Sequence, residues 1–199
     1  MIRIPHVSAQ RIAGLAFALV LSSAVLFGCS AAAAPSKESS SSGSANTSEG
    51  STAQSQKPAK VEEGVEAPDF EFATMDGSTA KLSDYKGDVV VLTFWATWCG
   101  YCMRDMPVMN EISQNFEDVQ VVAINRGDRT ADAQAKAEDL GYDFAWGLDE
   151  DGAINALYPA NGIPYTVIID KDGVVSSSIP GSAPDMYAYL EKAITKAGA

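Results

Sequence analysis

The stretch Trp95-Ala-Thr-Trp-Cys99-Gly-Tyr-Cys102 follows a continuously apolar segment and contains two of the three cysteines of the chain. Its position is typical of a junction at which a strand gives way to a helix. A helix that begins at Cys99 directs its unpaired amides and the positive end of its dipole at that sulfur. Both effects stabilise a thiolate, the form of cysteine that attacks disulfides. The pair therefore predicts a reversible two-electron switch.

Two simpler explanations of the pair are a structural disulfide and two buried thiols. A disulfide across two residues gains little chain entropy, because the gain grows with the length of the closed loop. The surrounding aromatic residues and the strand–helix junction also favour redox chemistry. In this interpretation Cys99, at the helix N-terminus, is the exposed nucleophile and Cys102 is the resolving thiol.

The chain is acidic and has a single histidine. Its 14 basic and 26 acidic side chains give a formal net charge of −12; without residues 1–28, 12 basic side chains face 26 acidic ones, a net charge of −14. This charge, without any Lys/Arg cluster, argues against nucleic acid and against adhesion to anionic lipid. The single histidine is His6, so residues 7–199 can form neither a His-ligated metal site nor a His-dependent hydrolytic site. The pair Cys99 and Cys102 supplies only half of a structural zinc site. We expect no metal and no organic cofactor.

The N-terminus has the features of an export signal. Arg3 and Arg11 precede a nearly continuous apolar segment over residues 12–27. This pattern predicts a signal peptide over residues 1–28, with an uncleaved membrane anchor as the alternative. Leu26-Phe-Gly-Cys29 resembles a bacterial lipoprotein signal, which implies lipidation of Cys29; ordinary secretion is the alternative. Both secretion and lipidation would place the protein outside the cytoplasm, where disulfides persist.

The rest of the chain divides into a polar segment and one domain. Residues 29–63 are mostly small and polar, and they cannot bury enough apolar surface to offset their ordering entropy. They predict a disordered Ser-rich tether, for which ~30 residues span roughly 30 Å. Residues 64–199 have the length of one ordinary domain.

The pattern of this domain predicts an α/β fold. Alternation around Asp76-Gly77 indicates a hairpin over residues 71–80. Further strands are expected over 88–95, 119–125, 165–170 and 174–179, and helices over 99–116, 131–140, 151–158 and 183–196. This order places parallel strands first and an antiparallel hairpin last. We therefore expect a mixed central sheet with helices on both faces.

Three motifs together resemble the thioredoxin superfamily: Trp98-Cys-Gly-Tyr-Cys102 after a buried strand, Pro107 five residues beyond Cys102, and Gly162-Ile-Pro-Tyr-Thr166 before a hairpin. The lipoprotein-like start, Glu66-Ala-Pro-Asp-Phe70 and Asp170-Lys-Asp-Gly173 are similar to those of the TlpA/ResA/CcmG-like membrane-tethered thiol-disulfide oxidoreductases. The resemblance covers roughly residues 64–198 and implies a thioredoxin-like fold.

The resemblance also assigns a substrate-binding surface. It implies that Pro164 is cis and packs beside the disulfide, which leaves the backbone of Ile163 free to pair with a substrate strand. Trp98, Gly100 and Tyr101 would complete this surface, because they lie next to the two cysteines in the sequence.

An acidic residue three positions after the second cysteine is linked to thiol ionisation in the same family, and here that residue is Asp105. A nearby carboxylate raises the pKa of a thiol and can accept its proton. Thr93 stands where ordinary thioredoxins carry a buried aspartate, which shifts the proton relay to Asp105. The alternative for Asp105 is an ordinary helix acid favoured by the dipole.

These observations predict an extracytoplasmic, lipid-anchored reductase of protein disulfides, in cytochrome c maturation or general disulfide reduction. Its partners would be protein disulfides such as apocytochrome c and a membrane electron donor of the CcdA type. A disulfide-forming oxidant is the alternative within the same chemistry. A peroxiredoxin-like peroxidase is weaker, because Thr97 does not stand in a Pro-x-x-x-Thr-x-x-Cys motif. A non-catalytic thiol-binding module or copper carrier is the third possibility.

Two loop motifs receive no functional role. Arg126-Gly-Asp128 spells a cell-adhesion tripeptide, but a loop after a strand collects such residues freely. The acidic run Asp149-Glu-Asp-Gly152 lacks the spacing of a calcium-binding loop and indicates a helix start.

Overall fold

A computed structural model of the chain describes residues 61–199. The predicted signal peptide, Cys29 and all but the last three residues of the predicted tether lie outside the described residues. Those three residues make contacts with the domain: Val61 packs against its core, and Lys196 Nζ lies 3.1 Å from Glu63 Oε2. In residues 61–199 no helix combines the length and the apolar character needed to cross a bilayer.

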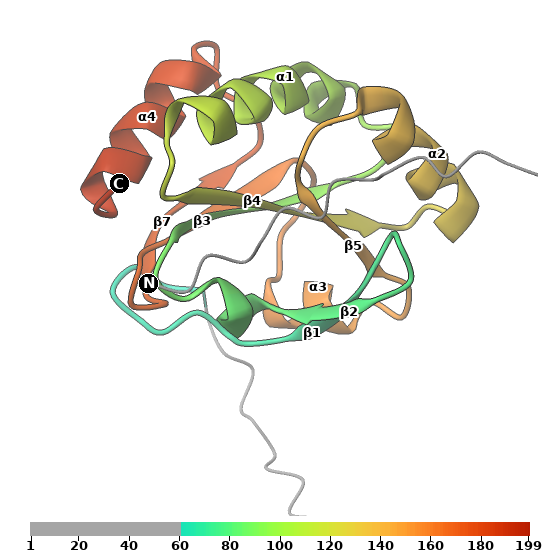
Figure 1. Ribbon diagram of the computed structural model, residues 1–199, viewed down its shortest axis with the longest axis horizontal. Coiled ribbons are helices and arrows are strands. Elements are labelled where there is room, and N and C mark those ends of the chain that lie inside the picture. Colours follow the sequence, from blue (N-terminus) through green and yellow to red (C-terminus); the bar gives the residue numbers. More distant parts are fainter. Residues whose placement is uncertain (1–60) are drawn as a thin grey trace, which may run out of the picture. The chain divides into compact units, whose positions relative to one another are not determined.

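A seven-stranded mixed sheet forms the centre of the domain, with the strand order β2-β1-β5-β4-β3-β6-β7 (Figure 1). The strands β3, β4 and β5 are parallel to one another, and the remaining neighbours are antiparallel. The strands are β1 (Glu71–Thr74), β2 (Thr79–Lys81), β3 (Val89–Trp95), β4 (Val119–Arg126), β5 (Ala145–Asp149), β6 (Tyr165–Ile169) and β7 (Val175–Pro180).

Strand β3 is the central element of this sheet. All seven of its residues are buried, as expected for a continuously apolar strand that is covered on both faces. It pairs in parallel with β4 from Val89↔Val119 to Trp95↔Asn125, and in antiparallel with β6, where Phe94 lies opposite Tyr165. The C-terminal end of β3 therefore meets the beginning of β6 at one edge of the sheet.

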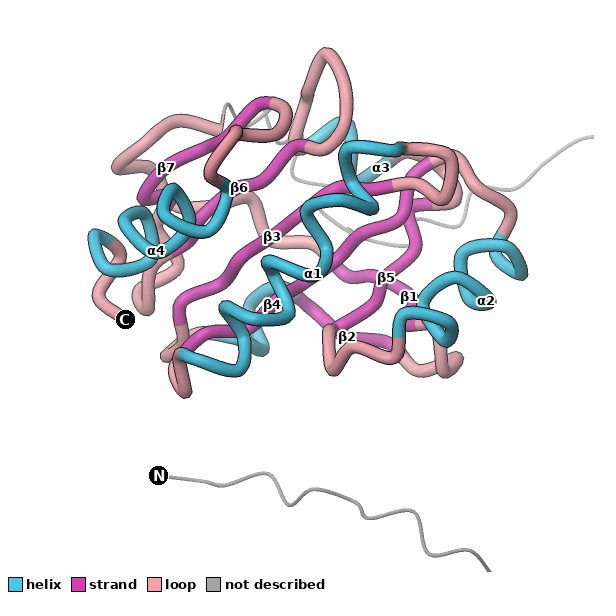
Figure 2. The backbone as a smooth tube through the Cα atoms, turned by 90° about the horizontal axis from the view of Figure 1, so that it is seen from above, coloured by secondary structure: helices cyan, strands magenta, loops and turns pink. Residues whose placement is uncertain are grey.

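Helices cover both faces of the sheet, which confirms the predicted thioredoxin-like architecture. The helices are α1 (Gly100–Asn115), α2 (Thr130–Leu140), α3 (Ala153–Leu157) and α4 (Met186–Lys196), with a short 3-10 helix, η1 (Leu82–Tyr85). Figure 1 shows α1, α2 and α4 on one face and α3 on the other, and Figure 2 shows α1 lying across β3 and β4. On the first face, α1 buries Met106, Met109 and Ile112 in a core shared with α4.

The N-terminal segment of the described chain pairs with the beginning of β7. Gly64 N donates to Val175 O at 2.8 Å, Val175 N donates to Val65 O at 2.9 Å, and Glu66 forms an isolated bridge with Val174. Val175 pairs with Ile169, at the end of β6 that is remote from Tyr165. The chain therefore enters the domain at the edge of the sheet opposite to the end of β3.

The predicted strands and helices are all present, with ends that differ by three residues at most. The largest difference is at α4, which begins at Met186 because Asp185 caps it by accepting a hydrogen bond from Ala188 N. Strand β5 and helix η1 were not predicted. The β5 sequence Ala145-Trp-Gly-Leu-Asp149 lacks β-branched residues, and its conformation is set by pairing with β4 and β1.

Gly147 allows β5 to approach its neighbours closely. A Cβ atom at this position would lie 2.4 Å from Phe72 Cδ2 and 2.6 Å from Ile124 Cδ1. Both of these side chains belong to the core on the face that carries α3. A larger residue would therefore have to displace a buried ring.

We expect Gly147→Ala to lower the free energy of unfolding by roughly 1–3 kcal/mol, the usual cost of overpacking a core. The measurement is urea unfolding, in which the midpoint should fall without a change in slope. Gly162→Ala is the matched control, because an added Cβ there meets no atom within 4 Å. A wild-type midpoint for Gly147→Ala would contradict this packing.

Candidate active site

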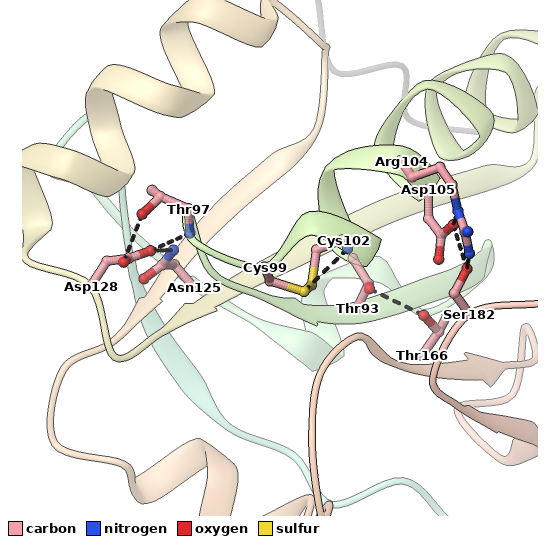
Figure 3. Close-up of a disulfide and its surroundings, with 10 residues drawn as sticks. All are labelled: Thr93, Thr97, Cys99, Cys102, Arg104, Asp105, Asn125, Asp128, Thr166 and Ser182. Atoms are coloured by element: carbon pink, nitrogen blue, oxygen red, sulfur yellow. Dashed lines mark hydrogen bonds and ion pairs between the residues drawn. A yellow bond between two sulfur atoms is a disulfide. The ribbon is translucent and has the colours of Figure 1, made fainter.

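The two cysteines form a disulfide at the N-terminus of α1, as predicted. Cys99 and Cys102 are bonded, with their Cα atoms 5.2 Å apart. Cys99 is the N-cap of the helix, and its Sγ accepts a hydrogen bond from Cys102 N at 3.1 Å (Figure 3). The sulfur of Cys99 thus occupies the position of a capping oxygen, and a helix amide is directed at it.

The prediction that Cys99 is exposed is wrong for this disulfide form. Cys99 is 5% exposed and Cys102 is 1% exposed, so neither is a surface residue. The reason is the cap itself, which turns Cys99 Sγ back onto the first turn of α1. The exposed side chains beside the disulfide are Trp98 and Tyr101, at 70% and 63% exposed.

The two tryptophans of the motif have different environments. Trp95 is fully buried and packs edge-on against Trp146, with the ring centroids 5.3 Å apart. It is therefore a core residue. Trp98 is a large apolar side chain in solvent next to a reactive disulfide, which is typical of a surface that another protein covers.

The loop before β6 has the expected cis peptide bond between Ile163 and Pro164. Pro164 is buried, and it directly precedes Tyr165, which pairs with Phe94 at the end of β3. This register brings the loop to the same edge of the sheet as Cys99. Pro164 O accepts a hydrogen bond from Gly181 N at 2.9 Å. The backbone of Ile163 has no hydrogen-bonding partner among residues 61–199.

A hollow of about 660 Å³ lies between Trp98 and Ile163. It is bounded on its far side by Arg126 and by the acidic segment from Asp149 to Gly152. A second hollow, of about 280 Å³, also borders Ile163 and is lined mainly by proline, glycine and tyrosine. Ile163, whose backbone groups are free, therefore borders two depressions that side chains of a bound strand could enter.

Asp105 is a buried acid, not an ordinary acid on the surface of the helix. It is 2% exposed, and its Oδ1 accepts a hydrogen bond from Ser182 Oγ at 2.6 Å. Arg104 Nε lies 3.5 Å from the same oxygen. Asp105 Oδ2 is buried and has no hydrogen-bonding partner in the described part of the chain. Figure 3 shows the carboxyl turned toward Ser182 and Arg104, on the helix that carries Cys102.

The position beneath the disulfide is uncharged. Thr93 is buried on β3, and its Oγ1 lies 3.1 Å from Thr166 Oγ1 on β6, close enough for a hydrogen bond in which either hydroxyl is the donor. The two threonines satisfy each other across the sheet. This leaves Asp105 as the buried carboxyl nearest to Cys102 along α1.

Asp128 is a residue of the site to which the sequence analysis gave no role. Its Oδ2 accepts hydrogen bonds from Thr97 N at 2.6 Å and Asn125 Nδ2 at 2.8 Å, and its Oδ1 accepts one from Thr97 Oγ1 at 2.8 Å. These bonds fix the loop that leads into Cys99. The available signal was topological: Thr97 and Asp128 follow two neighbouring parallel strands and so meet at one edge of the sheet.

These contacts change the acidity of Asp128. Partial burial would raise its pKa, but the hydrogen bonds from Asn125 and Thr97 outweigh this effect and hold the pKa below its ordinary value of 3.8. A carboxyl with a lowered pKa stabilises the folded state while it is ionised. That contribution is lost as the pH falls through the folded-state pKa.

The acidic segment before α3 is a helix start, as predicted. The two carboxylate oxygens of Asp149 accept hydrogen bonds from Ile154 N and Asn155 N, and Asp151 Oδ1 accepts one from Ala153 N. Within residues 61–199 no cluster of three or more His, Cys, Asp or Glu side chains is arranged to hold a metal ion.

Known proteins share this fold and this site. The profile of the AhpC/TSA family matches residues 64–178, more than half of the chain. The chain belongs to the AhpC/TSA family. It is 36% identical over 132 residues to the thiol-disulfide oxidoreductase ResA of Geobacillus thermodenitrificans (strain NG80-2), which covers 64% of this chain and 76% of ResA.

Solved structures with a similar fold also include thiol-disulfide interchange and thioredoxin proteins. A proposed thiol:disulfide interchange protein DsbE from Chlorobium tepidum superposes with a TM-score of 0.66 at 35% identity, covering 69% of this chain and 99% of that one. The pneumococcal exposed lipoprotein thioredoxin Etrx1 from Streptococcus pneumoniae strain TIGR4 superposes with a TM-score of 0.56 at 32% identity, covering 63% and 98%. With its Cys99–Cys102 disulfide, this member of the family is a thiol-disulfide oxidoreductase of thioredoxin-like fold.

We expect Asp128→Asn to destabilise the domain at pH 7 by about 1–3 kcal/mol, because donors in the Thr97 loop lose a charged acceptor. The difference from wild type should shrink below pH 4, as the wild-type carboxyl itself becomes protonated. Urea unfolding at pH 7 and pH 3 measures both effects. Asp132→Asn is the control, because its ion pair with Arg129 is exposed and contributes little. A difference that grows at low pH would contradict the assignment.

Proposed function

We propose that this protein is an extracytoplasmic, lipid-anchored reductase of protein disulfides. The observation that carries the proposal is the Cys99–Cys102 disulfide at the N-terminus of α1, at the same edge of the sheet as the cis Ile163–Pro164 loop. One element supplies an activated sulfur, and the other supplies a backbone to which an extended substrate can pair.

The reaction is a thiol–disulfide exchange in two steps. The Cys99 thiolate attacks one sulfur of a substrate disulfide, forms a mixed disulfide and releases the first substrate sulfur, which takes up a proton. The thiolate of Cys102 then attacks Cys99 Sγ, the bond to the substrate breaks, and the second substrate sulfur leaves and is protonated. The substrate gains two electrons and two protons, and the enzyme is left with the Cys99–Cys102 disulfide.

Asp105 supports the direction of this reaction. A dithiol whose thiolate form is well stabilised is a strong oxidant. In residues 61–199 only one hydrogen bond, from Cys102 N, is directed at a cysteine sulfur. A buried carboxyl one turn away from Cys102 opposes the formation of thiolate there and so favours the oxidised couple. We therefore assign Asp105 the role of accepting the Cys102 proton during the second step.

The substrate-binding surface follows from exposure and free backbone groups. Trp98 and Tyr101 offer exposed aromatic surface on either side of Gly100, and Ile163 offers its unpaired amide and carbonyl. Pro164 fixes the loop that presents them. A substrate strand that pairs with Ile163 would have the two hollows that border this residue available for its side chains.

The cellular setting rests on the N-terminal sequence. The apolar segment ending in Leu26-Phe-Gly-Cys29 supports export and lipidation at Cys29. The similar Etrx1 is itself described as an exposed lipoprotein. Outside the cytoplasm a reductase needs electrons from across the membrane, and we propose a membrane dithiol protein of the CcdA type as the donor. Apocytochrome c is one candidate substrate, and general protein disulfides are the other.

The competing activities have less support. The Thr97 hydroxyl donates to Asp128 instead of lying free beside Cys99, which argues against a peroxidase site that depends on a threonine. An oxidant uses the same two sulfurs with the opposite direction of electron flow. The two differ in the reduction potential of the Cys99–Cys102 couple.

We expect that potential to lie near or below the thioredoxin value of about −270 mV, and the wild-type protein to reduce insulin disulfides. A potential near about −120 mV would instead assign the oxidant role. Equilibration with glutathione or dithiothreitol buffers measures the potential, and insulin precipitation measures the activity.

The two cysteine variants separate the roles of the sulfurs. Cys99→Ser should abolish insulin reduction, whereas Cys102→Ser should trap the substrate in a mixed disulfide that survives non-reducing electrophoresis. Activity that persists in Cys99→Ser, or no turnover by the wild type, would refute the proposed catalysis.

Cys29→Ala tests the anchor. The wild-type chain should incorporate labelled fatty acid and sediment with membranes, and the variant should do neither, because the acyl chains are the only attachment that we propose. Ser30→Ala is the matched control and should behave like the wild type. A variant that stays with the membrane would indicate an uncleaved anchor instead.

A further inference from the structure

We propose that Ser182 and Arg104 are positioning residues that hold the Asp105 carboxyl by its Oδ1 atom and keep Oδ2 free for the Cys102 proton. This inference rests on the proposed function, in which Asp105 receives that proton. Neither residue would touch the substrate or the reacting sulfurs. Their contribution is to fix one orientation of a buried acid.

The first observation is a chain of contacts that ends on a single carboxylate oxygen. Arg104 Nη2 donates to Ser182 Oγ at 2.5 Å, and Ser182 Oγ donates to Asp105 Oδ1 at 2.6 Å (Figure 3). Arg104 Nε also lies 3.5 Å from Oδ1. The Ser182 hydroxyl therefore both accepts and donates, and its proton is oriented by the guanidinium toward Asp105.

The second observation is the state of the other oxygen. Asp105 Oδ2 is buried and without a hydrogen-bonding partner in residues 61–199, although Asp105 is only 2% exposed. A buried carboxylate oxygen without a donor is costly, and such atoms call for a functional explanation. A proton released by Cys102, three residues earlier on α1, is a suitable partner, because side chains at this spacing are neighbours on a helix.

Arg104 is fixed at a second point. Its guanidinium lies over the ring of Tyr101, with Cζ 4.9 Å from the centroid. An ion pair of a half-exposed arginine usually contributes little, because ordering the long side chain costs entropy. Here the side chain is held at three points: the Tyr101 ring, the Ser182 hydroxyl and the Asp105 carboxylate. Arg104, which orients Ser182, thus also packs on Tyr101, the exposed aromatic residue between the two cysteines.

The surroundings of Asp105 contain few other charges. Its ionic contact is with Arg104, and the other groups at the start of α1 that can titrate are Tyr101 and, once the disulfide is reduced, the two cysteines. From the α4 side, Asp185 is bonded to Ala188 N and the Tyr187 hydroxyl accepts from Asn115. Thr93 and Thr166, on β3 and β6, are uncharged and pair with each other. Arg104 and Ser182 are therefore the groups that act most directly on the Asp105 carboxyl.

In the resolving step, the proton of Cys102 Sγ moves to Asp105 Oδ2. The electron pair left on Cys102 Sγ forms the bond to Cys99 Sγ, and the bond between Cys99 and the substrate breaks. The substrate sulfur leaves with that electron pair and takes a proton from water. Asp105 later returns its proton to solvent, so the cycle changes only the substrate and the cysteine pair.

The test is the pH dependence of this single step. A mixed disulfide is formed on Cys99 with a small aromatic thiol, and its resolution by Cys102 is followed by stopped flow from pH 4 to pH 9. The Ser182 hydroxyl and the Arg104 guanidinium both stabilise negative charge on the Asp105 carboxylate, so removing either one destabilises the ionised form that accepts the Cys102 proton. We expect the rising limb of the profile to move to higher pH in Ser182→Ala and in Arg104→Gln, with a rate at pH 6 reduced about tenfold.

Three variants make the result specific. Ser182→Thr keeps the hydroxyl and should restore the wild-type profile. Lys136→Gln is matched to Arg104→Gln in the charge that it removes, but it disrupts a pair with Asp139 on α2, which contacts neither Asp105 nor Ser182, and it should leave the profile unchanged. In an Asp105→Asn background, Ser182→Ala should cause no further shift, because the two residues act through the same carboxyl.

A wild-type profile in both Ser182→Ala and Arg104→Gln would overturn the inference, as would a shift that persists in the Asp105→Asn background. If Ser182→Ala does not fold, Arg104→Gln decides the question, because the Arg104 side chain is 55% exposed. Failure of the proposed function would look different: the wild-type protein would then not reduce insulin at all.

Discussion

The position of β3 between β4 and β6 is the constraint on which the rest of the site depends. Its residues are covered on both faces and bonded along both edges, so the strand cannot shift without breaking both ladders. This determines the position of Trp95, which only three residues separate from Cys99. The same pairing with β6 determines where Pro164 emerges. The disulfide and the cis-proline loop lie over 60 residues apart in sequence, and the backbone pairing of β3 with β6 brings them to one edge of the sheet.

Two opposing electrostatic influences meet at the disulfide. The N-terminus of α1 favours negative charge on Cys99 through the amide of Cys102. The buried carboxyl of Asp105 disfavours negative charge at Cys102, on the same helix. In the proposed reaction, one sulfur is therefore activated for attack, and the other gives up its proton only in the second step. This asymmetry arises because Cys99, Cys102 and Asp105 follow one another at intervals of three residues at the start of α1.

Much of this arrangement could be predicted from sequence because it depends on local patterns. The apolar run of β3, the Cys99–Cys102 spacing and the glycine that ends α2 each specify their own conformation. The parts that were missed depend on partners distant in sequence. Strand β5 is extended because β4 and β1 flank it, and Asp128 matters because Thr97 lies on the neighbouring parallel connection. The contact of Ser182 with Asp105 joins residues 77 positions apart, which no periodicity reveals.

The pairing of residues 64–66 with the beginning of β7 has a mechanical consequence. The chain enters the domain at the edge of the sheet opposite to the disulfide, through hydrogen bonds between Gly64, Val65 and Val175. A pull on the preceding segment would load these few bonds and the β7 edge before it reached β3. Such a load would therefore act first on the side of the domain that is remote from the redox centre, and the strand that positions the disulfide would be among the last elements to feel it.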